Sequence, residues 1–209
     1  MIQDEAGGHS FRSFEPFWEG PAHNSLLDVS ADARRNIERL MDLLDACADP
    51  LPELQAMLSE VNWRPQLVAA VAMLCCRPEQ RPVDALWRAM DDGSWVSPQL
   101  AVVASAVDPG FLEQARRRIE ARCPISERLS GIPWEMRHSA AGPGSVVGHS
   151  AKLLSSLVAV VGHSAAPPAW FAQQRDDAEV KAMIASDLDR GGFLALDWLA
   201  RLHALRNER

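Results

Sequence analysis

Three histidines in the second half of the chain stand in similar short contexts, each followed by serine: His138, His149 and His163. An imidazole can act as a general base or bind a metal ion. Histidines that share a metal on one helix stand three or four residues apart, whereas His149 and His163 stand 14 apart. Along a helix that spacing corresponds to about 21 Å. We therefore expect these histidines to be loop and helix-cap residues.

Residues 138–148 also contain three glycines, at Gly142, Gly144 and Gly148. Their spacing does not match the G-x-G-x-x-G phosphate loop, and no strand is predicted before them. The serine in this stretch lacks the G-x-S-x-G frame of a hydrolase nucleophile. The segment is therefore predicted to be a Gly/Ser/Pro loop. An enzyme that uses the region from His138 to His163 stays open as an alternative, and it predicts a bound metal or cofactor.

Neighbouring carboxylates occur at Asp91-Asp92, at 176–179 and at 187–189. Such groups can bind a divalent cation or transfer protons. Each of them falls at a predicted helix end or on a solvated face, where acidic residues are common. The stretch 187–192 begins like a calcium loop but lacks the third acidic ligand and the closing glutamate. We therefore expect no metal and no cofactor, and no catalytic residue is assigned.

The composition is acidic, with 28 acidic against 21 basic residues and a net charge of −7. A nucleic-acid-binding protein needs a basic surface, so this class is disfavoured. The charge suits a basic protein partner, although it also keeps a protein soluble without any partner. Only two of the basic residues are lysines, Lys152 and Lys181, which is typical of a GC-rich bacterial genome.

Cysteine usage and hydropathy indicate a soluble, cytoplasmic protein. The four cysteines form no CxxC pair and lie within apolar helical patterns, as expected of buried free thiols in a reducing compartment. The N-terminal residues lack the apolar core of a signal peptide. The most apolar run, Leu153 to Gly162, is too short to span a bilayer. No membrane association is expected.

Apolar residues recur at helical spacing throughout residues 25–209, and no stretch alternates with period two. The pattern predicts a single all-α domain of antiparallel helix pairs, stacked as a short HEAT-like α-solenoid or an irregular bundle. An aromatic arm, residues 1–24, is expected to dock on it through Phe11, Phe14, Phe17 and Trp18. Helices are predicted for 31–47 with Ser30 as cap, after Asp49-Pro50, and near 149–161, 168–188 and 192–206.

Two similar phrases mark a tandem repeat: NWRPQLVAAV at 62–71 and SWVSPQLAVV at 94–103. Aligning Pro65 with Pro98 gives an offset of 33 residues. Each copy is an apolar helix rich in small residues, followed by a more charged helix, and the two units are predicted to cover 62–93 and 94–123. A helix pair repeated in tandem is the signature of an α-solenoid. The first helix of each pair should be sandwiched between neighbours, because it is apolar nearly all round.

Several of the seven tryptophans lie beside the repeats, where they are expected to fill the grooves between units. Trp and Arg also anchor protein interfaces, so an exposed subset would form a partner surface. The predicted partner-binding residues lie at the two equivalent turns: Trp63, Arg64, Trp87, Asp91, Asp92 and Trp95.

Residues 62–111, from NWRPQL to AVDPGF, resemble a group of bacterial HEAT-like proteins that act as immunity partners of secreted antibacterial toxins, including type VI secretion effectors. The resemblance covers about a quarter of the chain and implies a cytoplasmic, non-enzymatic protein that binds one cognate toxin. An acidic inhibitor would suit a basic toxin. A helical scaffold or adaptor without a toxin partner is the alternative, and the sequence does not indicate an oligomeric state.

Overall fold

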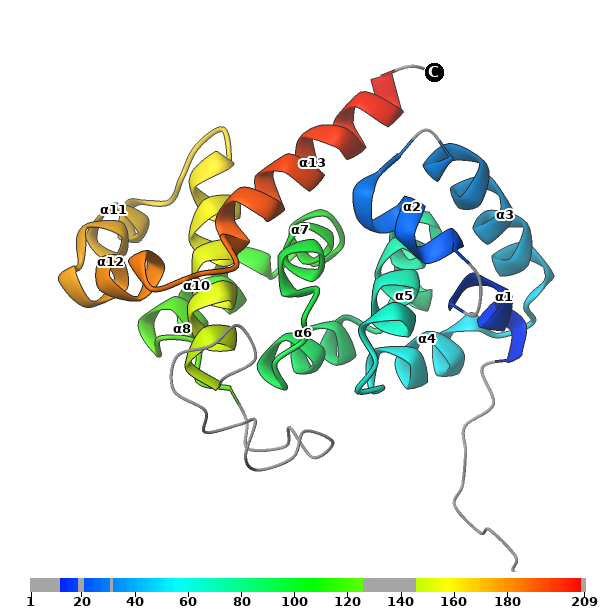
Figure 1. Ribbon diagram of the computed structural model, residues 1–209, viewed down its shortest axis with the longest axis horizontal. Helices are drawn as coiled ribbons and strands as arrows, with labels where there is room; N and C mark the ends of the chain where they lie inside the picture. The colour runs from blue at the N-terminus through cyan, green and yellow to red at the C-terminus, as the bar shows by residue number, and fades with distance from the viewer. Residues whose placement is uncertain (1–11, 19–20, 31, 126–145, 208–209) are drawn as a thin grey trace, which may run out of the picture.

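The computed structural model describes residues 12–18, 21–30, 32–125 and 146–207, and all regular structure in these ranges is helical (Figure 1). The all-α prediction is therefore confirmed. The helices are η1 Arg12–Phe14, α1 Glu15–Trp18, α2 Ala22–Asp28, α3 Ala33–Ala46, α4 Pro50–Leu58, α5 Trp63–Cys75, η2 Pro78–Gln80, α6 Val83–Asp91, α7 Ser97–Val107, α8 Phe111–Glu120, α10 Val146–His163, α11 Ala169–Asp176, α12 Ala178–Ala185 and α13 Gly191–Asn207.

The helices form two rows, and α13 lies across the inner row as a third layer (Figure 1). An inner row places α5, α7 and α10 side by side, and an outer row contains α4, α6 and α8. Each inner helix packs on the outer helix that precedes it, so the structural pairs are α4–α5, α6–α7 and α8–α10. The pairs expected from the sequence began one helix later. The pairing differs from the expectation because α5 packs on α4 and α7 packs on α6, in each case the helix that precedes it.

Helix α13 crosses over the inner row and ties the two ends of the array together (Figure 1). It packs on α10 and α7. Further along, the Trp198 indole Nε1 donates to the Leu26 carbonyl at 3.0 Å, and Arg201 Nη1 donates to the Asp28 carbonyl at 2.8 Å. The last helix thus contacts α2 near the start of the described chain.

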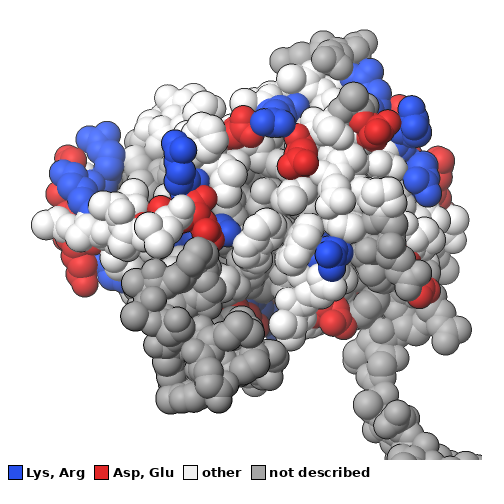
Figure 2. Space-filling view, viewed as in Figure 1, with Lys and Arg blue, Asp and Glu red and all other residues white. Residues whose placement is uncertain are grey.

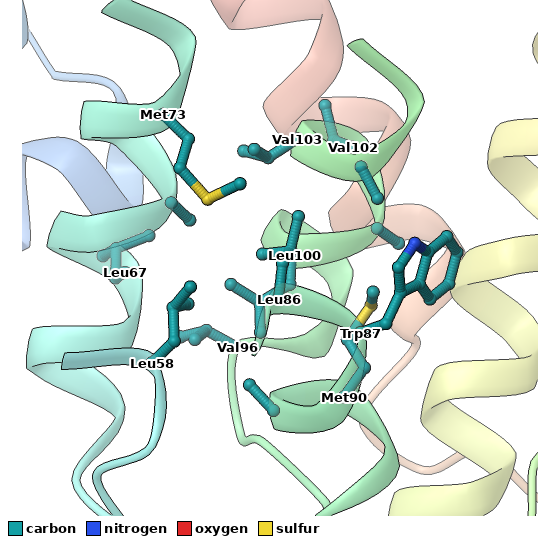
Figure 3. Close-up of a cluster of buried hydrophobic side chains, with 14 of the residues drawn as sticks. Leu58, Leu67, Met73, Leu86, Trp87, Met90, Val96, Leu100, Val102 and Val103 are labelled. Atoms are coloured by element: carbon teal, nitrogen blue, oxygen red, sulfur yellow. The ribbon is translucent and has the colours of Figure 1, made fainter. Parts of the chain in front are cut away.

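The core lies between the rows, where side chains from successive units meet. Figure 3 shows Leu67 and Met73 of α5 facing Leu86 of α6 and Leu100 and Val103 of α7, and all five are fully buried. Helices α5 and α7 are buried on nearly every side, as predicted from their apolar composition. Their many alanines allow close approach of the helix backbones.

Local capping explains where the helices begin. Asp49 caps α4, as predicted, by accepting the Leu51 N–H at 3.3 Å. Helix α5 starts two residues before Pro65, because the Asn62 side chain accepts the Arg64 N–H at 3.0 Å. Asp32, and not Ser30, is the residue that precedes α3, and the Ser30 main-chain carbonyl accepts the Ala33 N–H at 2.9 Å.

The single helix expected over 168–188 is divided into α11 and α12. Asp177 lies between them with extended backbone, and its carboxylate accepts the N–H groups of Glu179 and Val180 at 3.0 Å each. An aspartate in this position ends one helix and caps the next, which the apolar spacing alone did not reveal.

Two other expected segments are covered only in part. Of the arm, Phe14 and Phe17 are fully buried against the domain, while residues 1–11 and the Trp18 side chain lie outside what is described. Of the loop predicted at 138–148, residues 138–145 lie outside the described ranges and 146–148 form the first turn of α10. Within the described ranges, no helix is both long and apolar enough to cross a bilayer.

Candidate partner-binding surface

The structure divides the sequence-predicted partner residues between two places. Trp63, Arg64 and Trp95 meet at the N-terminal ends of the inner helices α5 and α7. Trp87 and Asp91 belong to α6 and face α8. The turns of successive units therefore do bring aromatic side chains together, but not all six residues share one face.

The first group is an aromatic ladder across two units. The Trp63 and Trp95 ring centroids are 5.2 Å apart at a tilt of 48°. On the other side of Trp63, the His23 ring meets it edge-on at 5.4 Å. Arg64 joins this end, with Nε 3.1 Å from His23 Nε2 and Cζ 5.2 Å from the Trp63 ring. We call His23, Trp63, Arg64 and Trp95 the tryptophan surface.

A buried lysine holds Trp95 from the protein side. Lys152 of α10 is only 2% exposed, and its Nζ lies 4.8 Å from the centre of the Trp95 ring. The same ammonium forms an ion pair with Asp189 Oδ2 at 3.0 Å. Burial of a charge requires such a partner, and a cation over an indole face is attracted to it. Trp95 is nevertheless 47% exposed, so a fixed aromatic ring is presented to solvent.

Sequence reasoning missed His23, Lys152 and Asp189. Lys152 is one of only two lysines and lies in a strongly apolar helix, which is a signal that it needs a buried partner. No local pattern connects it with Asp189, which lies 37 residues later in the loop before α13.

The second group fastens α6 to α8. Trp87 is 3% exposed, stacks on Phe111 at 5.9 Å, and donates from Nε1 to Asp108 Oδ2 at 2.8 Å. Arg118 Cζ lies 4.3 Å from the centre of the Trp87 ring, and the guanidinium donates two hydrogen bonds to Asp91, of 2.6 and 2.7 Å. Trp87 and Asp91 are thus occupied within the protein.

Asp92 is the residue that follows α6, and it is half-buried. Figure 2 shows acidic and basic side chains at both ends of one face of the molecule and also along its upper edge, with uncharged areas between them.

The histidine region does not form a constellation. His149 and His163 both lie in α10, the first buried and the second exposed at the far end, and His138 is outside the described residues. Burial lowers the pKa of His149, the neighbouring Lys152 charge lowers it further, and Asp189 opposes both effects. In the described part of the chain, no group of three or more His, Cys, Asp or Glu residues could hold a metal ion.

All four cysteines are free thiols. Burial raises the pKa of Cys76 to about 11, with Cys75 adding to the effect and Arg81 opposing it. Burial also raises the pKa of Cys123 strongly. Both groups stay protonated at neutral pH, which makes them poor nucleophiles.

Comparison of the chain with protein-family models, with curated proteins and with solved structures found no match.

Proposed function

We propose that this chain is a non-enzymatic protein-binding module, and that its partner docks on the tryptophan surface. The observation that carries this proposal is the ring contact between Trp63 and Trp95 of successive units, with Trp95 still 47% exposed. Large aromatic side chains that remain exposed are typical anchors of protein interfaces.

The contacts that restrict the Trp95 ring favour binding energetically. A side chain that is ordered only on binding loses rotamer entropy, which subtracts from affinity. Contacts with Trp63 and with the Lys152 ammonium already restrict the Trp95 ring in the free protein. Val61, two residues before Trp63 in the sequence, is also well exposed.

The most specific form of the proposal is a cytoplasmic immunity protein that neutralises a cognate bacterial toxin. It rests on the stacked helix pairs, on the HEAT-like character of residues 62–111, and on the net charge of −7, which suits a basic toxin. A scaffold or adaptor with a non-toxic partner uses the same surface and is the alternative.

Co-expression tests the function directly. The products of genes adjacent to the one for this chain are expressed with and without it, and growth is followed. The immunity function predicts that one product arrests growth and that this chain restores it. Should none of the neighbouring products be toxic, the immunity function is rejected.

The surface is tested with Trp95→Ala in the same assay and in a calorimetric titration with the purified partner. Loss of a central anchor is expected to weaken the Kd roughly 30-fold, about 2 kcal/mol. Leu188→Ala removes another well-exposed apolar side chain, in the loop before α13, and serves as the matched control. Equal protection and affinity for Trp95→Ala and the control would place the partner elsewhere. Circular dichroism confirms that both variants are folded.

A further inference from the structure

A second candidate site lies at the opposite end of the inner helices. A cleft of about 650 Å³ is bounded by α3, by the C-terminal ends of α5 and α7, and by the C-terminal half of α13. Trp63 and Trp95 lie at the N-terminal ends of α5 and α7, so the cleft is separate from the tryptophan surface. Its volume falls within the range of about 300–1,000 Å³ found for ligand pockets.

The wall of the cleft is aliphatic, and several of its side chains are partly exposed to solvent. The apolar lining residues are Ile37, Met41, Val71, Leu74, Val102, Ala106, Val107, Leu199, Leu202 and Leu205. Met41 and Ala106 are exposed, and Leu74, Leu199 and Leu202 are half-buried. Removing such surface from water is favourable, so an apolar occupant gains affinity here.

Basic residues outnumber acidic ones in the lining of the cleft, whereas the chain as a whole is acidic. Its lining contains Arg34, Arg81 and His203 against a single acid, Glu38, in a chain of net charge −7. Arg81 donates hydrogen bonds from Nε and Nη2 to the Cys76 carbonyl, at 3.1 and 2.8 Å. No carboxylate among the described residues forms an ion pair with Arg81. Its positive charge is therefore held in place and available to an anionic group.

The shape of the lining suits a flexible alkyl chain. The apolar side chains come from four helices, α3, α5, α7 and α13, and the cleft volume of about 650 Å³ lies in the range of small-molecule pockets. A flexible chain can follow an aliphatic wall of this kind.

We propose that this cleft binds a small amphiphile with one alkyl chain and a carboxylate head. The chain lies along the aliphatic side chains of α5, α7 and α13, and the carboxylate accepts hydrogen bonds from Arg81. A charge-assisted bond of this kind gives both affinity and orientation. This inference does not depend on the protein-binding function.

Isothermal titration calorimetry of the purified full chain with dodecanoate, below its micellar concentration, tests the proposal. Saturable binding to one site is expected, weakening about fourfold for each methylene removed from the probe. Dodecanol, which has the same chain and no charge, should bind at least tenfold more weakly. Absence of saturable binding overturns the proposal, and equal binding of the two probes overturns recognition of a carboxylate.

Variants locate the site. Ala106→Phe fills the cleft from an exposed position on α7, so it should abolish dodecanoate binding while the protein stays folded. Ala200→Phe, an exposed position of α13 outside the lining, is the matched control and should bind normally. Arg81→Gln should weaken dodecanoate about tenfold and leave dodecanol unchanged. Normal binding to Ala106→Phe overturns the assignment.

Sedimentation velocity checks a different occupant. If a second copy of the chain covered the cleft, a dimer would form that Ala106→Phe dissociates. That result would also overturn the amphiphile proposal.

Discussion

Substitution of Gly191 by alanine should loosen the attachment of α13. A Cβ at this position would lie 2.6 Å from the Lys152 carbonyl oxygen and 2.8 Å from both Lys152 Cγ and Ser156 Oγ. An ordinary contact begins near 3.4 Å, so the first turn of α13 must move by about 0.8 Å. The closest atom belongs to the backbone of α10 and cannot rotate away.

Overpacking of this kind costs about 1–3 kcal/mol. For a chain of this length, each kcal/mol lowers Tm by about 2–4 °C, so the expected fall is roughly 2–12 °C. Thermal melts followed by circular dichroism at 222 nm, together with urea titrations, measure it. The prediction concerns α13 packing and not glycine in general, so a second glycine is needed as a control.

Gly162→Ala supplies that control within α10. Its Cβ would meet only the Phe171 ring, at 3.2 Å, and replacing glycine by alanine inside a helix contributes about 0.5–1 kcal/mol of stability. The Phe171 ring has to shift by only a few tenths of an ångström, so we expect the Tm of Gly162→Ala to fall less than that of Gly191→Ala. A Gly191→Ala protein as stable as the Gly162→Ala protein would refute the close approach of α13 to α10.

Three further predictions follow from contacts described above. Asp91→Ala should lower the free energy of unfolding by about 1–2 kcal/mol, because it leaves the half-buried Arg118 without its carboxylate, whereas Glu113→Ala in the exposed pair with Arg117 should cost less than about 0.5 kcal/mol; urea titration distinguishes them. Burial lowers the folded-state pKa of His149, so the unfolded chain binds its proton more readily. The contribution of His149 to the free energy of unfolding is therefore fully present above pH 6.5, the ordinary pKa of histidine, and is lost as the pH falls below that value. Urea midpoints at pH 7.5 and 5.5 should differ less in His149→Gln than in the wild type, and an equal difference would contradict the assignment. Iodoacetamide at pH 8 should leave Cys76 and Cys123 unmodified until urea unfolds the chain, as read by mass spectrometry, and labelling of Cys123 at the rate of a free thiol would show that it is accessible.

Most helix positions could be predicted because their signals are local. The side chain of Asp49 caps a nearby N–H, Gly93 has the positive φ of 84° that ends α6, and apolar residues recur at helical spacing. The break at Asp177 was not predicted, because apolar residues continue at helical spacing on both sides of it. The break depends on the hydrogen bonds that one carboxylate accepts, and the spacing of apolar residues does not indicate these.

The surface was less predictable, because its contacts join distant residues. The repeat placed Trp63 and Trp95 at equivalent turns, and those two side chains do meet. Trp87 was assigned to the same turn, yet Asp108 and Phe111 from the following segment cover it. Whether a tryptophan near a repeat boundary is exposed depends on the next unit, and that cannot be read from the turn itself.

Closure by α13 has a consequence for how the chain folds. Stacked repeats contact only their neighbours, so an open array can unfold one unit at a time. Here the hydrogen bonds from Trp198 and Arg201 span 172 and 173 residues along the chain. These contacts connect the first described helices with the last one. Unfolding should therefore be cooperative over the whole array, and native packing of α2 must wait until the last helix of the array has been synthesised.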